Sequence, residues 1–185
     1  MPLKITLTLS DGDLQHFRRA IREARKTLDK TGEETVIKAA SDLITRVRAR
    51  EVPEFVQERI EQLALFVEMV TNDRWGMPAE VRTRVLTSLA YFSDPDDIIH
   101  DDVPGIGFLD DAIMVELVLR EMKHEIDAYR DFKAFGLVDK EGRREGVIDE
   151  EEFRERREAL RTRARRRGRR DKEKATARGW KISLW

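Results

Sequence analysis

The chain of 185 residues contains no cysteine, only three histidines, and no long uninterrupted apolar run. The lack of cysteine excludes a disulfide-stapled scaffold, a thiolate zinc site and a cysteine nucleophile. A membrane-spanning helix needs about 18 or more apolar residues in succession, and no apolar block near the first residue resembles a signal peptide. We therefore expect a cytoplasmic protein with no transmembrane segment.

Common catalytic signatures are missing as well. The sequence has no glycine-rich phosphate loop, no Gly-x-Ser-x-Gly and no His-Glu-x-x-His. This lowers the expectation of an enzyme without excluding one. We assign no catalytic residue.

Charged residues make up 39% of the chain and nearly cancel, at a net charge of −1, but the two signs are separated along the sequence. Residues 154–185 carry fourteen basic and four acidic side chains, a net charge of +10, which leaves −11 for residues 1–153. This separation predicts a tail that binds a polyanion, or one that folds back onto its own acidic body.

Apolar spacings of three and four residues predict a mainly α-helical protein, a compact multi-helix bundle. A further stretch, residues 112–119, is apolar around nearly its whole circumference and predicts a central buried helix, capped by Asp110 or Asp111. The expected buried positions of the first four helices are Leu14, Phe17, Ile21, Ala24 and Leu28; Val36, Ala40, Leu43 and Val47; Val56, Ile60, Leu63, Val67 and Val70; and Val81, Val85, Leu89 and Phe92.

Alternating patterns at both ends of the chain favour short β-strands. Residues 4–9 place Ile5, Leu7 and Leu9 on one face, and the last residues alternate in the same way. One hypothesis pairs the N-terminal strand with a C-terminal strand, in the same chain or in a homodimer. The alternative is that the end of the chain is a docking peptide formed by Trp180, Ile182, Leu184 and Trp185.

A strand followed by two helices also resembles the ribbon-helix-helix layout of dimeric DNA-binding proteins. In that layout Lys4, Thr6 and Thr8 would face the DNA groove. This gives an alternative function, a nucleic-acid-binding regulator.

Residues 93–111 read SDPDDIIHDDVPGIGFLDD, in which two prolines and two glycines interrupt six apolar residues. The stretch resembles the signature of the YkvA-like family, a bacterial domain of unknown function, over about residues 82–130. The resemblance implies a compact helical unit and supplies no reaction. His100 departs from the family's proline, and Asp96 and Asp102 depart from its apolar residues. The matching positions are Pro95, Asp97, Ile99, Asp101, Pro104, Gly107, Asp110 and Asp111.

These patterns divide the chain into three parts. Residues 1–52 form the N-terminal strand and two helices, residues 53–135 the YkvA-like core, and residues 136–185 a linker with an arginine-rich extension.

Aspartates in this region suggest a divalent-metal site for Mg²⁺ or Ca²⁺, since hard oxygen ligands suit both ions. The alternative is that these carboxylates cap helices, close turns and pair with arginines. Glu116 stands alone in an apolar run, so that burial would give it a basic partner or a raised pKa, and otherwise it lies on an exposed edge. The candidate ligands are Asp97, Asp101, Asp110 and Asp111, with Glu116.

Residues 135–153 resemble an EF-hand calcium loop between helices. Arg143, however, falls at an expected ligand position and speaks against calcium. The alternative is a turn followed by the start of a helix.

Residues 150–178 predict an extended charged helix, with acidic residues first and arginines later, as suits the helix dipole. The arginines are dense enough to bind phosphates, and no aromatic residue lies among them for base stacking. We therefore expect a non-enzymatic interaction or adaptor protein whose tail contacts an acidic protein surface or nucleic acid. The candidate binding residues are Arg161, Arg163, Arg165, Arg166, Arg167, Arg169 and Arg170.

Overall fold

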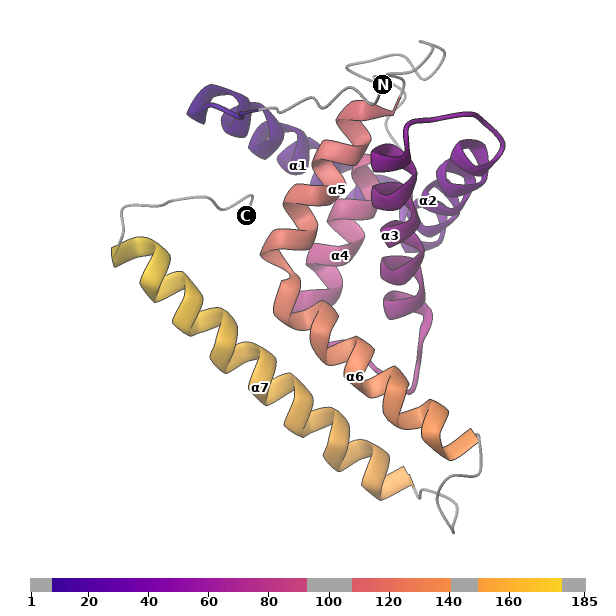
Figure 1. Ribbon diagram of the computed structural model, residues 1–185, viewed down its shortest axis with the longest axis vertical. Coiled ribbons are helices and arrows are strands. Elements are labelled where there is room, and N and C mark those ends of the chain that lie inside the picture. Colours follow the sequence, from indigo (N-terminus) through magenta and orange to yellow (C-terminus); the bar gives the residue numbers. More distant parts are fainter. Residues whose placement is uncertain (1–7, 93–107, 141–149, 178–185) are drawn as a thin grey trace, which may run out of the picture.

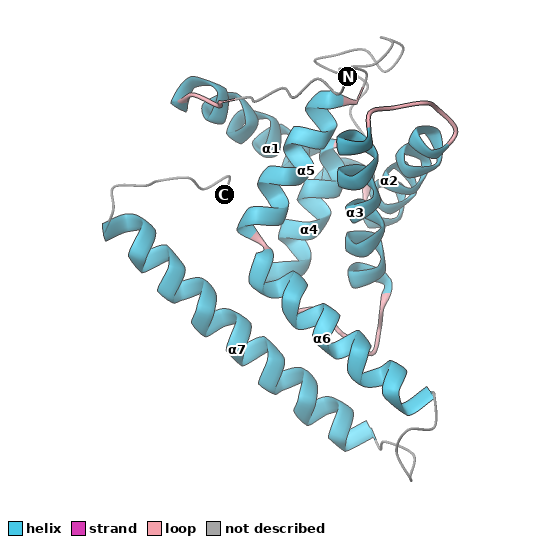
Figure 2. Ribbon diagram, in the orientation of Figure 1, coloured by secondary structure: helices cyan, strands magenta, loops and turns pink. Residues whose placement is uncertain are grey.

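The computed structural model describes residues 8–92, 108–140 and 150–177, and the regular structure in these ranges is entirely helical (Figures 1 and 2). None of the described helices combines the length and the apolar character needed to cross a bilayer. The helices are α1 (Asp11–Thr31), α2 (Glu33–Arg48), α3 (Glu54–Thr71), α4 (Ala79–Tyr91), α5 (Leu109–Glu121), α6 (Lys123–Lys140) and α7 (Glu150–Ala177).

The expected N-terminal strand is wrong. Thr8 and Leu9, the part of it that the structure describes, form no strand, and no strand occurs elsewhere in the described ranges to pair with them. Leu9 instead packs against the core, and Ser10 begins α1 with a capping box. The Ser10 hydroxyl accepts from the backbone N–H of Asp13, while the Asp13 carboxylate accepts from the backbone N–H of Ser10 at 2.8 Å. The described chain is therefore all-α.

The ribbon-helix-helix layout requires this strand and so loses its main support. The rest of the N-terminal segment, residues 4–7, and the expected C-terminal strand lie outside the described residues.

Helices α1 to α5 form the bundle that the apolar spacing predicts. α1 packs on α4, α2 on both α3 and α4, and α3 on α5. The expected apolar positions of α1 and α2 are all buried, and those of α3 and α4 are buried except for Val67 and Val81, which are half-buried against the core. The central helix α5 is confirmed, with Ala112, Met114, Val115 and Val118 almost fully buried.

Gly32 separates α1 from α2. Its φ of 83° lies in the region that favours glycine, and its backbone N–H donates to the carbonyl of Leu28, which ends α1. The chain can then change direction within a single residue, and α2 packs against α3 and α4.

Helices α6 and α7 form a second, antiparallel pair (Figure 1). A single residue, Met122, separates α5 from α6, so that α6 extends the central helix beyond the bundle. α7 runs back along α6 and confirms the predicted charged C-terminal helix. The arginine-rich segment is therefore a docked helix with one face against the protein.

Candidate functional site

The inner face of α7 is apolar at three positions, Phe153, Leu160 and Ala164, all of them buried. Their spacings of seven and four residues place them on one side of the helix. The Phe153 ring lies against the rings of Phe132 and Phe135 on α6, with centroid separations of 5.9 and 5.4 Å. These contacts fix the rotation of α7 about its axis and decide which arginines point outwards.

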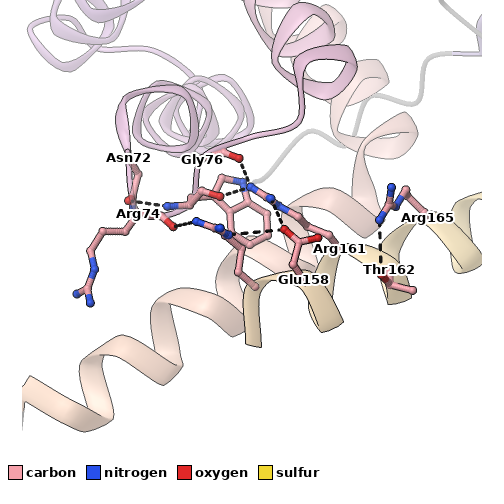
Figure 3. Close-up of polar contacts among 9 residues, drawn as sticks. Asn72, Arg74, Gly76, Glu158, Arg161, Thr162 and Arg165 are labelled. Atoms are coloured by element: carbon pink, nitrogen blue, oxygen red, sulfur yellow. Dashed lines mark hydrogen bonds and ion pairs between the residues drawn. The ribbon is translucent and has the colours of Figure 1, made fainter. Parts of the chain in front are cut away.

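Arg161 anchors α7 to the loop between α3 and α4. Its side chain is only 11% exposed, and its guanidinium donates to the backbone carbonyls of Trp75 and Gly76 and to Glu158 (Figure 3). The guanidinium carbon lies 5.1 Å from the centroid of the Trp75 ring. Burial lowers the pKa of Arg161, and the charge of Glu158 opposes this effect. Arg161 therefore acts as a structural anchor.

The loop itself is held by Trp75, which is 3% exposed. Its ring packs on Tyr129 and Phe132 of α6, at centroid separations of 5.5 and 5.2 Å. Gly76 has a φ of 48°, and a Cβ there would lie 3.3 Å from the carbonyl oxygen of Asp73, so that glycine is required at this position. The loop thus presents backbone carbonyls to α7 in a fixed geometry.

Asn72 and Tyr129 hold the base of this loop. The Asn72 side chain accepts from the backbone N–H of Trp75 and donates to the Tyr129 hydroxyl, both at 3.1 Å. Burial raises the pKa of Tyr129 to about 12, so the phenol stays protonated at neutral pH. Trp75 and Asn72 were not predicted from the sequence; the available signal was a tryptophan between the apolar positions of the third and fourth expected helices.

A second contact holds α7 nearer its C-terminal end. Nε2 of His124, on α6, lies 2.7 Å from the carboxylate of Asp171. The hydrogen bond with His124 lowers the pKa of Asp171. This contact lies about ten residues along α7 from Arg161, so both halves of the helix are tied to the rest of the protein.

Replacing Gly168 with alanine is expected to stabilise the protein by about 0.5–1 kcal/mol, because glycine is unfavourable inside a helix. The new Cβ would lie 3.9 Å from the His124 ring, an ordinary van der Waals contact, so alanine fits without strain. Urea denaturation measures the change. A lower stability of the alanine variant would show that α7 packs more tightly at Gly168 than described here, and would contradict the prediction.

One flank of α7 carries a row of cations, Arg163, Arg166, Arg167, Arg170 and Lys174, which we name the arginine face. Arg163, the adjacent pair Arg166 and Arg167, Arg170 and Lys174 follow one another at steps of three or four residues, so they line one flank of the helix. All are exposed except Arg167, which is half-buried. Within the described residues, none of the five forms an ion pair at contact distance, although the charge of Asp171 acts on Arg170 and Lys174, whereas many other basic residues form ion pairs. Their charge is therefore available to a partner.

The remaining predicted arginines, Arg165 and Arg169, lie on another edge of α7. Arg165 donates weakly to Thr162 at 3.5 Å, and Arg169 lies 3.6 Å from Glu173. A shallow hollow of about 500 Å³ lies at the start of the arginine face, lined by Glu158, Ala159, Thr162, Arg163, Arg166 and Arg167.

The structure places two of the predicted aspartates. Asp110 and Asp111 lie in the first turn of α5, each about 5% exposed, where their charge suits the helix dipole. Neither is the N-cap: that position is taken by Phe108, with a φ of 66° and no side-chain cap bond. The capping expectation for these residues is therefore wrong.

Other candidates fall outside the described residues: Asp97, Asp101, residues 141–149 of the EF-hand-like segment, and Trp180, Ile182, Leu184 and Trp185. In the described ranges, no group of three or more potential ligand side chains could hold a metal ion. Helix α7 begins at Glu150, within the EF-hand-like segment. The start of a helix is what the alternative to a calcium loop predicts there.

Glu116 has two basic partners, as one of the alternatives for it predicts. The carboxylate accepts from Arg59 at 2.9 Å and from Arg120 at 2.7 Å. Burial alone would raise the pKa of Glu116, but the two arginines lower it below its ordinary value. Glu116 lines a groove of about 670 Å³ together with Glu58 and Glu61. Glu54 also lines this groove, and the other three acids are paired with arginines of the chain, Arg59 being shared by Glu58 and Glu116.

Comparison with known proteins gives one family match. Residues 81–117 match a family described as "Protein of unknown function (DUF1232)", starting on α4 and ending on α5. This region therefore resembles an uncharacterised domain family. The sequence motif of residues 93–111 likewise indicated a domain of unknown function. No curated protein and no solved structure matches the chain. The match covers about a fifth of the chain and does not reach α7.

Proposed function

We propose that the chain is a non-enzymatic interaction module, built around a YkvA-like helical unit, which binds a negatively charged partner through the arginine face of α7. The observation that carries the proposal is the division of α7 into two faces. Arg161, Phe153 and Leu160 hold the inner face against the protein, while the arginine face has no ion-pair partner in the described residues.

Charge repulsion supports this function. Like charges three or four residues apart destabilise an isolated helix, by a few tenths of a kcal/mol for each pair. In α7 that cost is offset by the docked inner face, which keeps the cations close together on a fixed helix. A partner that brings negative charge would relieve the repulsion, and the fixed helix lowers the entropy lost on binding.

Replacing four members of the arginine face, Arg163, Arg166, Arg167 and Arg170, with glutamine is expected to weaken binding to a polyanion. On a heparin column, this variant should elute at a clearly lower salt concentration than the unmodified protein, because fewer counterions are exchanged. A matched control removes the same charge from exposed cations of α1 and α2: Arg19, Arg22, Lys30 and Lys38. Equal elution of the two variants would show that only net charge matters and would contradict the proposal.

A further inference from the structure

We infer that the partner of the arginine face is the phosphate backbone of a nucleic-acid duplex, bound with little regard to base sequence. This inference rests on the proposed function, because it names the partner of the same face.

The chemistry of the arginine face favours phosphate over a protein surface. Protein interfaces are centred on buried aromatic or aliphatic anchors. On α7 the large apolar side chains, Phe153 and Leu160, are already buried against the protein, and the exposed large hydrophobic residue of the described chain, Phe55, lies on α3. The arginine face therefore offers charge without an apolar anchor. Phosphates need only charge and donors, and the guanidinium fork binds them through two donors at once.

The dimensions of α7 suit a duplex. From Arg163 to Lys174 the arginine face extends about 16 Å along the helix axis. A duplex carries one phosphate per about 1.7 Å of its axis, so several phosphates lie within reach of the row. Arg165 and Arg169 add cations on a neighbouring edge, so that positive charge flanks the outward surface on two sides. The major groove is about 12 Å wide and admits one α-helix, whose flanking cations can reach the phosphates of both strands.

A duplex is favoured over a single strand for a separate reason. Proteins that bind single strands without sequence preference stack the bases on aromatic side chains. In the described part of α7 the aromatic residue is Phe153, and its ring packs against α6. The outward surface between the cations has the small side chains of Ala159 and Thr162 and the carboxylate of Glu158, whose charge is paired with Arg161. Without aromatic residues there, contacts to the nucleic-acid backbone dominate.

The test measures binding of the full chain to three labelled probes: a 20-base-pair DNA duplex, a single strand of the same length, and poly-L-glutamate. The duplex is expected to bind most tightly. With four phosphate contacts, the logarithm of its association constant should fall with the logarithm of the salt concentration with a slope of about −3.6. The four-glutamine variant of the arginine face should lose at least about tenfold in affinity for the duplex, and its α1–α2 control should keep it.

Two results would overturn the inference while leaving the proposed function intact. One is poly-L-glutamate binding as tightly as the duplex, with both interactions lost in the arginine-face variant. The other is a single strand that binds more tightly than the duplex in the same variant-dependent way. If none of the three probes binds at low salt, or if the variant and its control bind equally, the inference and the proposed function fall together.

Discussion

Replacing Trp75 with alanine is expected to lower the free energy of unfolding by about 3–5 kcal/mol, the usual cost of removing a large buried aromatic side chain. The ring fills the space between Tyr129, Phe132 and Arg161, so that its loss opens a cavity at the junction of α6, α7 and the loop. Denaturation in urea, followed by far-UV circular dichroism, measures the change. Because the whole junction rests on this ring, we expect a larger effect here than at any other single position discussed above.

Trp75→Phe is the matched control. Nε1 of Trp75 is buried and has no hydrogen-bond partner within the described residues, so phenylalanine removes an unsatisfied donor while keeping a ring in place. We expect it to cost much less than alanine. Equal losses for the two variants would contradict the packing of Trp75 described above.

Replacing Arg161 with methionine is expected to release α7 from the bundle while α1 to α5 stay folded. The change removes charge-assisted hydrogen bonds to the carbonyls of Trp75 and Gly76 and leaves those oxygens without this donor. Hydrogen bonds to charged groups contribute about 1.5–3 kcal/mol. A loss of about 2 kcal/mol would raise the open population of α7 about 30-fold.

Limited trypsin digestion measures this opening, since cleavage of a transiently open segment tracks its population when reclosing is fast. Arg165→Met is the matched control. It also removes one trypsin site from α7, but Arg165 makes only a weak contact with Thr162. We expect fast cleavage within α7 for the Arg161 variant and the unmodified rate for the control. The same rate for both would mean that Arg161 does not hold α7 in place.

Local sequence patterns were enough to predict the bundle. Phe17, Val36 and Ile60 each belong to a different series of apolar residues at helical spacing. The structure buries them because a helix places every third or fourth residue on one side. The prediction of an N-terminal strand was wrong for a related reason. Alternation in a short segment does not supply a partner strand, and Leu9 instead packs, half-buried, against the core as the residue before the N-cap of α1.

The candidate site was predicted only in part. The density of arginine indicated a charged helix, but all seven arginines look alike in the sequence. In the structure, Arg161 anchors the helix while the other arginines are exposed or half-buried. This difference follows from Phe153 and Leu160, which set the rotation of α7, and from carbonyls about 85 residues away in the chain, which bind Arg161. No local pattern contains such a long-range contact. For the same reason, the sequence could not show that the N-cap of α5 is Phe108 and not an aspartate.

The central claim is that one side of α7 holds the helix in place while the other binds a partner. The most direct test is a ¹H–¹⁵N NMR titration of the full chain with an unlabelled 20-base-pair duplex. We predict shifts for the side-chain Nε–H groups of Arg163, Arg166 and Arg170, and an unchanged indole signal for Trp75, because Trp75 stays buried under Arg161. Shifts confined to α1–α3, or a large shift of the Trp75 indole with no change on the arginine face, would contradict the claim.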